Sequence, residues 1–293
     1  MKKLLPLGSV ALACTLFAGC GGGESSYSNL VVFGDSLSDV GSYRTPGIAA
    51  IGGGQYTVNG TNSANWTELL ARELAVPAPC PAQTGLESSA PLAALAAPTT
   101  NHPGCFSYAQ GGARVTDPIG PWNKALLSLV PPDPSGYLGQ LTVPLVRQIQ
   151  RHLTVSNDKR FSETELVAVL AGGNDLFMQT AILKATLAAG GDPATAVPAA
   201  VAGMAQAGDE LAGYINTQIV GKGARHVVVV NLPDIGKTPD SLVQPAQTQA
   251  LITQMVQAFN AHLSGPLAGV PRVLLVDAFS ASRTRQPTRT ATA

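Results

Sequence analysis

The chain has 293 residues, 45% of them apolar and 12% charged, which is enough to bury one large α/β domain or two small ones. Its 18 basic and 18 acidic residues give a formal net charge of +0, which leaves no electrostatic case for nucleic acid as a partner. The 31 glycines and 22 prolines indicate many turns and long loops, and they argue against a helical bundle.

The first twenty residues have the features of an export signal. Two lysines precede an apolar run, residues 4–18, which is too short to span a bilayer comfortably. The run closes on FAGC, which ends at Cys20 and resembles a bacterial lipobox, and a glycine-rich tether, residues 21–28, follows. We expect residues 1–20 to be a lipoprotein-type signal peptide, with lipid at Cys20 anchoring the domain to a membrane surface. An ordinary signal peptide is the alternative; both predict an outer-membrane lipoprotein or a periplasmic or extracellular protein of a Gram-negative bacterium.

Export places the remaining cysteines in an oxidising compartment. Cys14 would leave with the signal peptide and Cys20 would carry lipid, so Cys80 and Cys105 are left. They bracket a Pro/Ala-rich stretch, residues 76–104, and we expect a disulfide that closes it and contributes about 3 kcal/mol. Two unpaired thiols are the alternative. No His/Cys cluster has the spacing of metal ligands, so we expect neither a metal nor a cofactor.

Five apolar, β-branched runs follow the tether, and a turn and a helical pattern come after each. Their continuous apolar character indicates strands buried on both faces, as in a parallel sheet. The predicted strands are residues 30–33, 106–109, 166–170, 226–231 and 272–277. The predicted helices are residues 63–75, about 138–153, 174–189, 195–219 and 240–264. This alternation predicts a doubly wound or flavodoxin-like α/β fold, with its ligand crevice at the carboxyl ends of the strands.

Residue types that suit catalysis follow the first three predicted strands. The segment GDSLSD exposes the Ser36 hydroxyl at a tight turn, although a serine there is also a common helix N-cap. The segment QGGA offers the Gly112 backbone N–H with no Cβ in the way, or is a simple turn. The segment GGND offers the Asn174 side-chain amide, or a helix cap. A nucleophile with two or three donors around one point is what acyl transfer requires.

Three sequence blocks carry a family resemblance. They are VVFGDSLSDVG (31–41), SYAQGGARV (107–115) and LAGGNDLF (170–177), and they resemble the first three blocks of the GDSL, or SGNH, hydrolases. The resemblance implies one domain over residues 29–279, a three-layer flavodoxin-like SGNH hydrolase fold with a five-stranded parallel sheet. It also implies hydrolysis of a small ester or lipid through an acyl-enzyme at Ser36. The oxyanion hole would comprise the backbone N–H groups of Ser36 and Gly112 and the side-chain amide of Asn174.

The fourth block of these hydrolases, an Asp-x-x-His near the C-terminus, has no counterpart in this sequence. The histidines are His102, His152, His226 and His262. None follows the last predicted strand, and we expect each to be structural or solvated. The resemblance therefore assigns no catalytic His or Asp, and it predicts impaired activity and a missing final helix, which would uncover part of the sheet.

The last residues, 280–293, form a basic tail without a large apolar side chain. One hypothesis is a reading-frame slip near residue 282. Codons exist for this tail that encode Asn-Pro-Asn-Arg-Tyr-Gly in another frame, similar to an Asn-Pro-x-x-Tyr-Gly stretch of GDSL relatives. A disordered basic terminus is the alternative.

Two other classes of function are open. A non-catalytic surface lipoprotein, or pseudoenzyme, would bind an ester or glycan in the same crevice, but it would not need an oxyanion hole. Flavin or nucleotide binding is suggested by the predicted sheet alone. The glycines at 52–54 follow no strand, and no G-x-G-x-x-G stands where a phosphate would need it.

Overall fold

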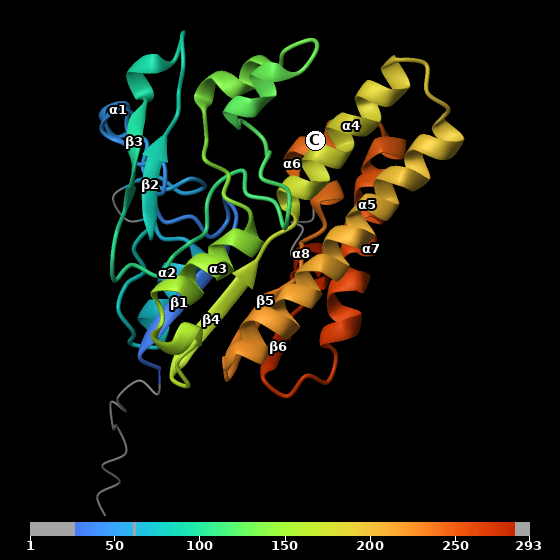
Figure 1. Ribbon diagram of the computed structural model, residues 1–293. Coiled ribbons are helices and arrows are strands. Elements are labelled where there is room, and N and C mark those ends of the chain that lie inside the picture. Colours follow the sequence, from blue (N-terminus) through green and yellow to red (C-terminus); the bar gives the residue numbers. More distant parts are fainter. Residues whose placement is uncertain (1–26, 61–62, 285–293) are drawn as a thin grey trace, which may run out of the picture.

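The computed structural model describes residues 27–60 and 63–284 (Figure 1). The predicted signal peptide with Cys14, the predicted lipidation site Cys20, most of the tether and residues 285–293 of the predicted tail lie outside them. Within the described ranges, no helix has the length and apolarity needed to cross a membrane.

A parallel four-stranded sheet forms the centre of the described domain, in the order β1-β4-β5-β6. Its strands are β1 (Asn29–Gly34), β4 (Glu165–Leu170), β5 (His226–Val230) and β6 (Val273–Val276). Every residue of β4 is buried, which agrees with the continuous apolar runs in the sequence. The predicted α/β class with a parallel sheet is confirmed.

The predicted second strand, residues 106–109, does not form a strand, and the prediction of five strands is therefore wrong for the described sheet. Ser107 makes an isolated parallel bridge to Val32 of β1. The Val32 N–H donates to the carbonyl of Phe106 at 2.9 Å, and the Val32 carbonyl accepts the N–H of Tyr108 at 2.8 Å. On its other side Ser107 bridges Pro81, which has no N–H to extend a ladder. The apolar pattern correctly places this segment beside β1, but it does not encode how many backbone pairs form there.

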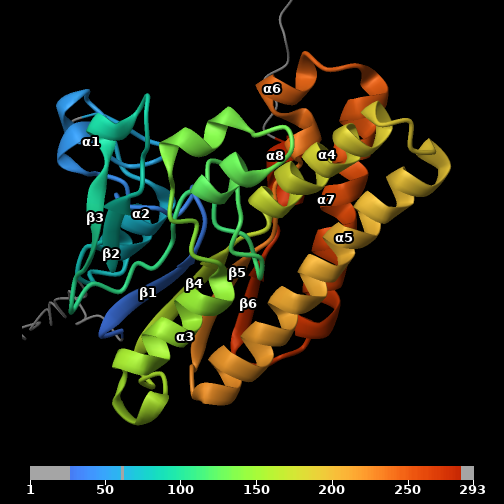
Figure 2. The same ribbon diagram turned by 45° about the horizontal axis from the view of Figure 1, so that its top comes forward.

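Three long helices cover one face of the sheet, as both ribbon views show (Figures 1 and 2). They are α3 (Leu145–Val155), α5 (Pro193–Tyr214) and α7 (Ala246–Leu267). The helix α4 (Gly173–Ala188) packs against α5 and α7 beyond the carboxyl ends of the strands. This side holds the main core, where Val31, Val167 and Val229 of the sheet pack with side chains such as Met204 and Phe259.

Among the helices of residues 27–60 and 63–284, only α2 (Trp66–Glu73) packs on the other face, over β1 and β4. There Leu30, Val32 and Ala168 pack against it. Over β6 the same face is open, since Leu274 is 62% exposed and Val276 is 39% exposed, whereas Val228 of β5 is partly buried against the α2 side. The described helices thus cover β1 and β4 on both faces and leave β6 covered on one.

The Pro/Ala-rich stretch contains an antiparallel hairpin of β2 (Gln83–Leu86) and β3 (Ala97–Asn101). The predicted disulfide between Cys80 and Cys105 is present, with a Cα–Cα distance of 5.0 Å. It ties the start of this stretch to the segment that bridges β1.

Capping residues set several helix limits that periodicity alone misplaced. Asn65 accepts hydrogen bonds from the N–H groups of Thr67 and Glu68, and Glu68 accepts one from the Asn65 N–H, so α2 begins at Trp66. Pro144 precedes α3, which therefore starts later than predicted. The predicted helix 240–264 is divided into α6 (Pro239–Leu242) and α7, and a further short helix, α1 (Pro46–Ala50), follows β1.

The chain continues after β6 as a short helix, α8 (Ala278–Thr284). The Asp277 carboxylate accepts the backbone N–H of Ser280 at 3.0 Å, which satisfies an N–H at the start of this helix. Arg283 pairs with Asp234 in the loop after β5 at 3.2 Å. The predicted start of the tail at residue 280 therefore falls inside a helix that contacts the rest of the domain.

Candidate active site

Ser36 lies in the turn that directly follows β1. Gly34 ends the strand where a Cβ would lie 2.3 Å from the carbonyl oxygen of Leu170, so only glycine fits there. The Asp35 carboxylate accepts the Leu37 N–H at 3.1 Å and closes the turn. Ser36 caps no helix, and neither its hydroxyl nor its backbone N–H has a hydrogen-bond partner among the described residues.

Gly112 lies in a turn with φ of 77°, a region that favours glycine. A Cβ there would lie 2.6 Å from Cγ2 of Thr142 and 2.7 Å from the carbonyl oxygen of Pro121. Gly112 is buried, yet its backbone N–H has no acceptor within residues 27–60 and 63–284. A buried N–H is normally paired, so this N–H is available to donate a hydrogen bond to a ligand or water oxygen.

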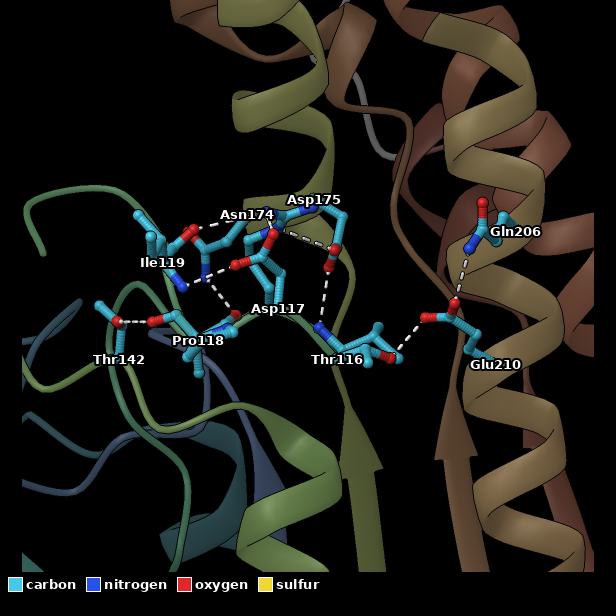
Figure 3. A network of polar contacts seen from close by, with 12 residues as sticks. Thr116, Asp117, Pro118, Ile119, Thr142, Asn174, Asp175, Gln206 and Glu210 are labelled. Carbon is cyan, nitrogen blue, oxygen red and sulfur yellow. Dashed lines mark hydrogen bonds and ion pairs between the residues drawn. The ribbon is translucent and has the colours of Figure 1, made fainter. Parts of the chain in front are cut away.

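Asn174 lies in the first turn of α4, where it is 2% exposed. Its side-chain amide donates to the carbonyl oxygen of Ala113 at 2.8 Å, which ties α4 to the residue after Gly112 (Figure 3). Gly172, with φ of 113°, occupies the N-cap position of α4, so Asn174 is not the cap.

Long-range hydrogen bonds hold these three segments together around Gly34. The Gln148 side chain, from α3, accepts the Gly34 N–H and donates to the Gly34 carbonyl, both at 2.9 Å. The Gln110 N–H donates to the same carbonyl at 3.2 Å, and Gly34 is in register with Leu170 of β4. The turns that carry Ser36, Gly112 and Asn174 therefore leave the sheet side by side.

Two further carboxylates fix the loop that carries Gly112. Asp39 accepts the Gly111 N–H at 2.9 Å, which joins the first turn to the second. Asp175 accepts the Val115 N–H at 3.0 Å and pairs with Arg114 at 3.1 Å, which joins the second turn to α4. Figure 3 shows Asp175 next to Asn174 above the backbone that leads to Thr116. Asp39 and Asp175 stand in the GDSLSD and GGND segments, but the sequence does not show what their carboxylates bind.

Burial dominates the electrostatics next to Ser36. Burial, with smaller contributions from the nearby carboxylates of Asp175 and Asp39, raises the pKa of Asp35 from its usual value of 3.8 to about 7. Hydrogen bonds from the N–H groups of Leu37 and Gly173 oppose this rise. Burial also raises the pKa values of Asp39 and Asp175, the latter opposed by Arg114. The turn thus carries a carboxyl group that exchanges its proton near neutral pH.

A cavity of about 480 Å³, here called the Ser36 cavity, opens beside this turn. Ser36 and Asn174 both line it, together with residues of α4, the loop after β5, α6 and the first turns of α7. Gly112 is not among the lining residues, and its connection to the cavity is through Ala113 and Asn174. The cavity has the size of a typical small-molecule site.

The GDSL-like lipase/acylhydrolase family matches residues 30–289 of the chain. The chain belongs to this family. A curated relative, "Uncharacterized protein in trpE-trpG intergenic region" from Pseudomonas putida, is 30% identical over 265 residues, which cover 86% of this chain and 37% of the relative. The chain thus spans little more than a third of that relative's length. Membership of this family supports an ester hydrolase at the family level. The matched region ends at residue 289, ten residues beyond the domain limit of 279 that the sequence blocks predicted.

None of the four histidines of this GDSL-family chain lines the Ser36 cavity. His226 is the first residue of β5 and so lies at the amino ends of the strands, away from Ser36. His152 is buried near this end of the sheet, where its ring stacks on Phe161 and its Nε2 lies 3.7 Å from the Glu165 carboxylate. His262 pairs with an aspartate at 2.9 Å on the exposed side of α7, and His102 contacts Thr84 in the hairpin. Each therefore occupies a structural or surface position.

Proposed function

We propose that this protein is a serine ester hydrolase in which Ser36 attacks the ester carbonyl. The Ser36 oxygen would bond to the carbonyl carbon, the serine proton would leave with the alcohol, and water would then hydrolyse the acyl-enzyme. The observation that carries this proposal is that Ser36 and Asn174 line one cavity at the carboxyl ends of the strands, and that the Ser36 hydroxyl has no hydrogen-bond partner in residues 27–60 and 63–284.

The oxyanion formed in this step would be stabilised by three donors. The backbone N–H groups of Ser36 and Gly112 are both without acceptors among the described residues, which leaves them available to a substrate oxygen. The Asn174 amide is the third donor, and its bond to Ala113 uses one of its two hydrogens. In serine hydrolases, removal of one such donor lowers kcat by about 10²- to 10³-fold.

We further propose that the activity of this 293-residue chain is impaired, because none of its histidines is near Ser36. Without a base the serine is a poor nucleophile, and the remaining acceleration comes from binding and oxyanion stabilisation. In a well-studied hydrolase this remainder is about 10³- to 10⁴-fold over the reaction in water, far below that of a complete triad.

A second candidate function is favoured by the same observation. A pseudoenzyme that binds an ester or glycan in the Ser36 cavity needs no catalytic base, so the absence of a histidine from the cavity lining would not weaken its binding. We propose that either form is exported and held at a membrane surface by lipid on Cys20.

A serine-reactive phosphonate separates the two functions. The probe, ethyl fluorophosphonate carrying a biotin, is incubated with the wild type and with Ser36→Ala, and the modified peptide is identified by mass spectrometry. Slow labelling at Ser36 over a long incubation, absent from Ser36→Ala, supports the impaired hydrolase, whereas no labelling of the folded protein supports the binder. A companion chain carrying the frame-corrected C-terminal segment is assayed on short p-nitrophenyl esters, where a rise in kcat over the present chain supports impairment by the missing base.

A further inference from the structure

We propose that the Ser36 cavity is an acyl-chain pocket for unbranched chains of about eight to ten carbons, and that Ala181 sets the length it accepts. This inference rests on the proposed function for the orientation of the ester, whose carbonyl would lie at Ser36 and Asn174. It extends that function by naming the acyl group and the residue that selects it.

The cavity follows one side of α4 away from the nucleophile. Asn174, Phe177, Ala181 and Lys184 all line it, and their spacing of three or four residues places them in one stripe along the helix. The rise of 1.5 Å per residue puts Ala181 about 10 Å beyond Asn174. An extended chain advances about 1.2 Å per bond, so about eight bonds reach Ala181.

Large apolar side chains line the cavity on two sides, with the hydroxyl side chains of Thr180, Thr238, Ser241 and Thr248 between them. Leu176 and Phe177 lie on the α4 side, and Leu232, Ile235 and Ile252 lie on the opposite side, from the loop after β5 and from α7. Phe177 is 49% exposed although it is large and apolar. An acyl chain in the cavity would cover this ring, and removing the two apolar surfaces from water would favour binding. A polar occupant such as a glycan would gain less free energy from the same contact.

The character of the lining changes beyond Ala181. Lys184 lies one turn further along α4 and is exposed, as is Ala181 itself. A methylene group that passes Ala181 would therefore reach an exposed charged side chain and remove little apolar surface from water, so further lengthening of the chain gains no affinity. The pocket therefore favours a medium acyl chain over a longer one.

The test uses methyl ketones, from 2-pentanone to 2-dodecanone, because they imitate an ester carbonyl and cannot be hydrolysed. Their binding to the full chain is measured by isothermal titration calorimetry. We expect Kd to fall about fourfold with each added methylene and to level off at about eight to ten carbons. A Kd that is independent of chain length overturns the proposal.

Two variants locate the chain. Ala181→Phe fills the cavity behind Phe177, so the affinity should level off at a shorter ketone while the binding of 2-pentanone is unchanged. The matched control is Ala202→Phe, at an exposed alanine of α5 outside the cavity, which should follow the wild-type curve. Phe177→Ala, which removes a wall, should weaken only the longer ketones. Ala181→Phe and wild-type curves that coincide, with both proteins folded by circular dichroism, overturn the role of Ala181.

The outcome is independent of whether Ser36 reacts. Length-dependent ketone binding by both the wild type and Ser36→Ala, without phosphonate labelling, supports the pocket and overturns the hydrolase. Phosphonate labelling of Ser36 without length-dependent ketone binding supports the hydrolase and overturns the pocket.

Discussion

The buried carboxyl group of Asp35 makes the stability of this protein depend on pH in a way that one substitution can isolate. Asp35 is 2% exposed, and its side chain accepts a backbone N–H in the turn that carries Ser36. The change Asp35→Asn retains the shape of the side chain and one acceptor oxygen, and it imitates the neutral carboxyl group at every pH.

The magnitude follows from the two pKa values of the group. In the folded protein the pKa is about 7, whereas the unfolded chain has the usual 3.8, so the folded state binds more protons between these values. The free energy of unfolding therefore falls as the pH rises from about 4 to about 7, by about 4 kcal/mol from Asp35 alone. Below and above this window Asp35 contributes no slope. The raised pKa values of Asp39 and Asp175 add a slope of the same sign, which the variant retains.

The assay is urea unfolding followed by circular dichroism at pH 4.5, 6 and 7.5. We expect the stability of Asp35→Asn relative to wild type to increase between pH 4.5 and pH 7.5 by about 3 kcal/mol, because this interval covers most of the window between the two pKa values. Asp158→Asn, at an exposed position with positive φ that asparagine tolerates, is the matched control and should run parallel to wild type. Parallel profiles of Asp35→Asn and wild type would refute the reasoning.

Three further changes test other parts of the structure. Gly112→Ala should destabilise by about 1–3 kcal/mol or more in urea unfolding, because φ is 77° and the new Cβ would meet Thr142; wild-type stability would contradict the close packing. Replacing Cys80 and Cys105 by serine should cost about 3 kcal/mol, since the bond closes a loop with a sequence separation of 25, and dithiothreitol should then have no added effect. Leu274→Lys should reduce the fluorescence of bound anilinonaphthalene sulfonate, with stability changed by less than about 0.5 kcal/mol, because this side chain is 62% exposed; unchanged fluorescence would place the dye elsewhere.

Local sequence patterns predicted the features that depend on near neighbours. The apolar runs located β1, β4, β5 and β6 to within one or two residues, because strands buried on both faces need continuous apolar side chains. They overestimated residues 106–109, which lie beside β1 and make one isolated bridge to it but form no strand. They also missed the hairpin between Cys80 and Cys105, where prolines and alanines hide the alternation.

The candidate site divides in the same way. The sequence by itself placed Ser36, Gly112 and Asn174 after three successive apolar runs, and it determined that no histidine follows the last one. Only the tertiary structure decided that the side chain of Gln148, 114 residues away in sequence, hydrogen-bonds both the N–H and the carbonyl of Gly34. It also decided that residues of α4 and α7 line a cavity beside Ser36. Periodicity records which face of an element is apolar, whereas these contacts depend on where distant elements come to rest against one another.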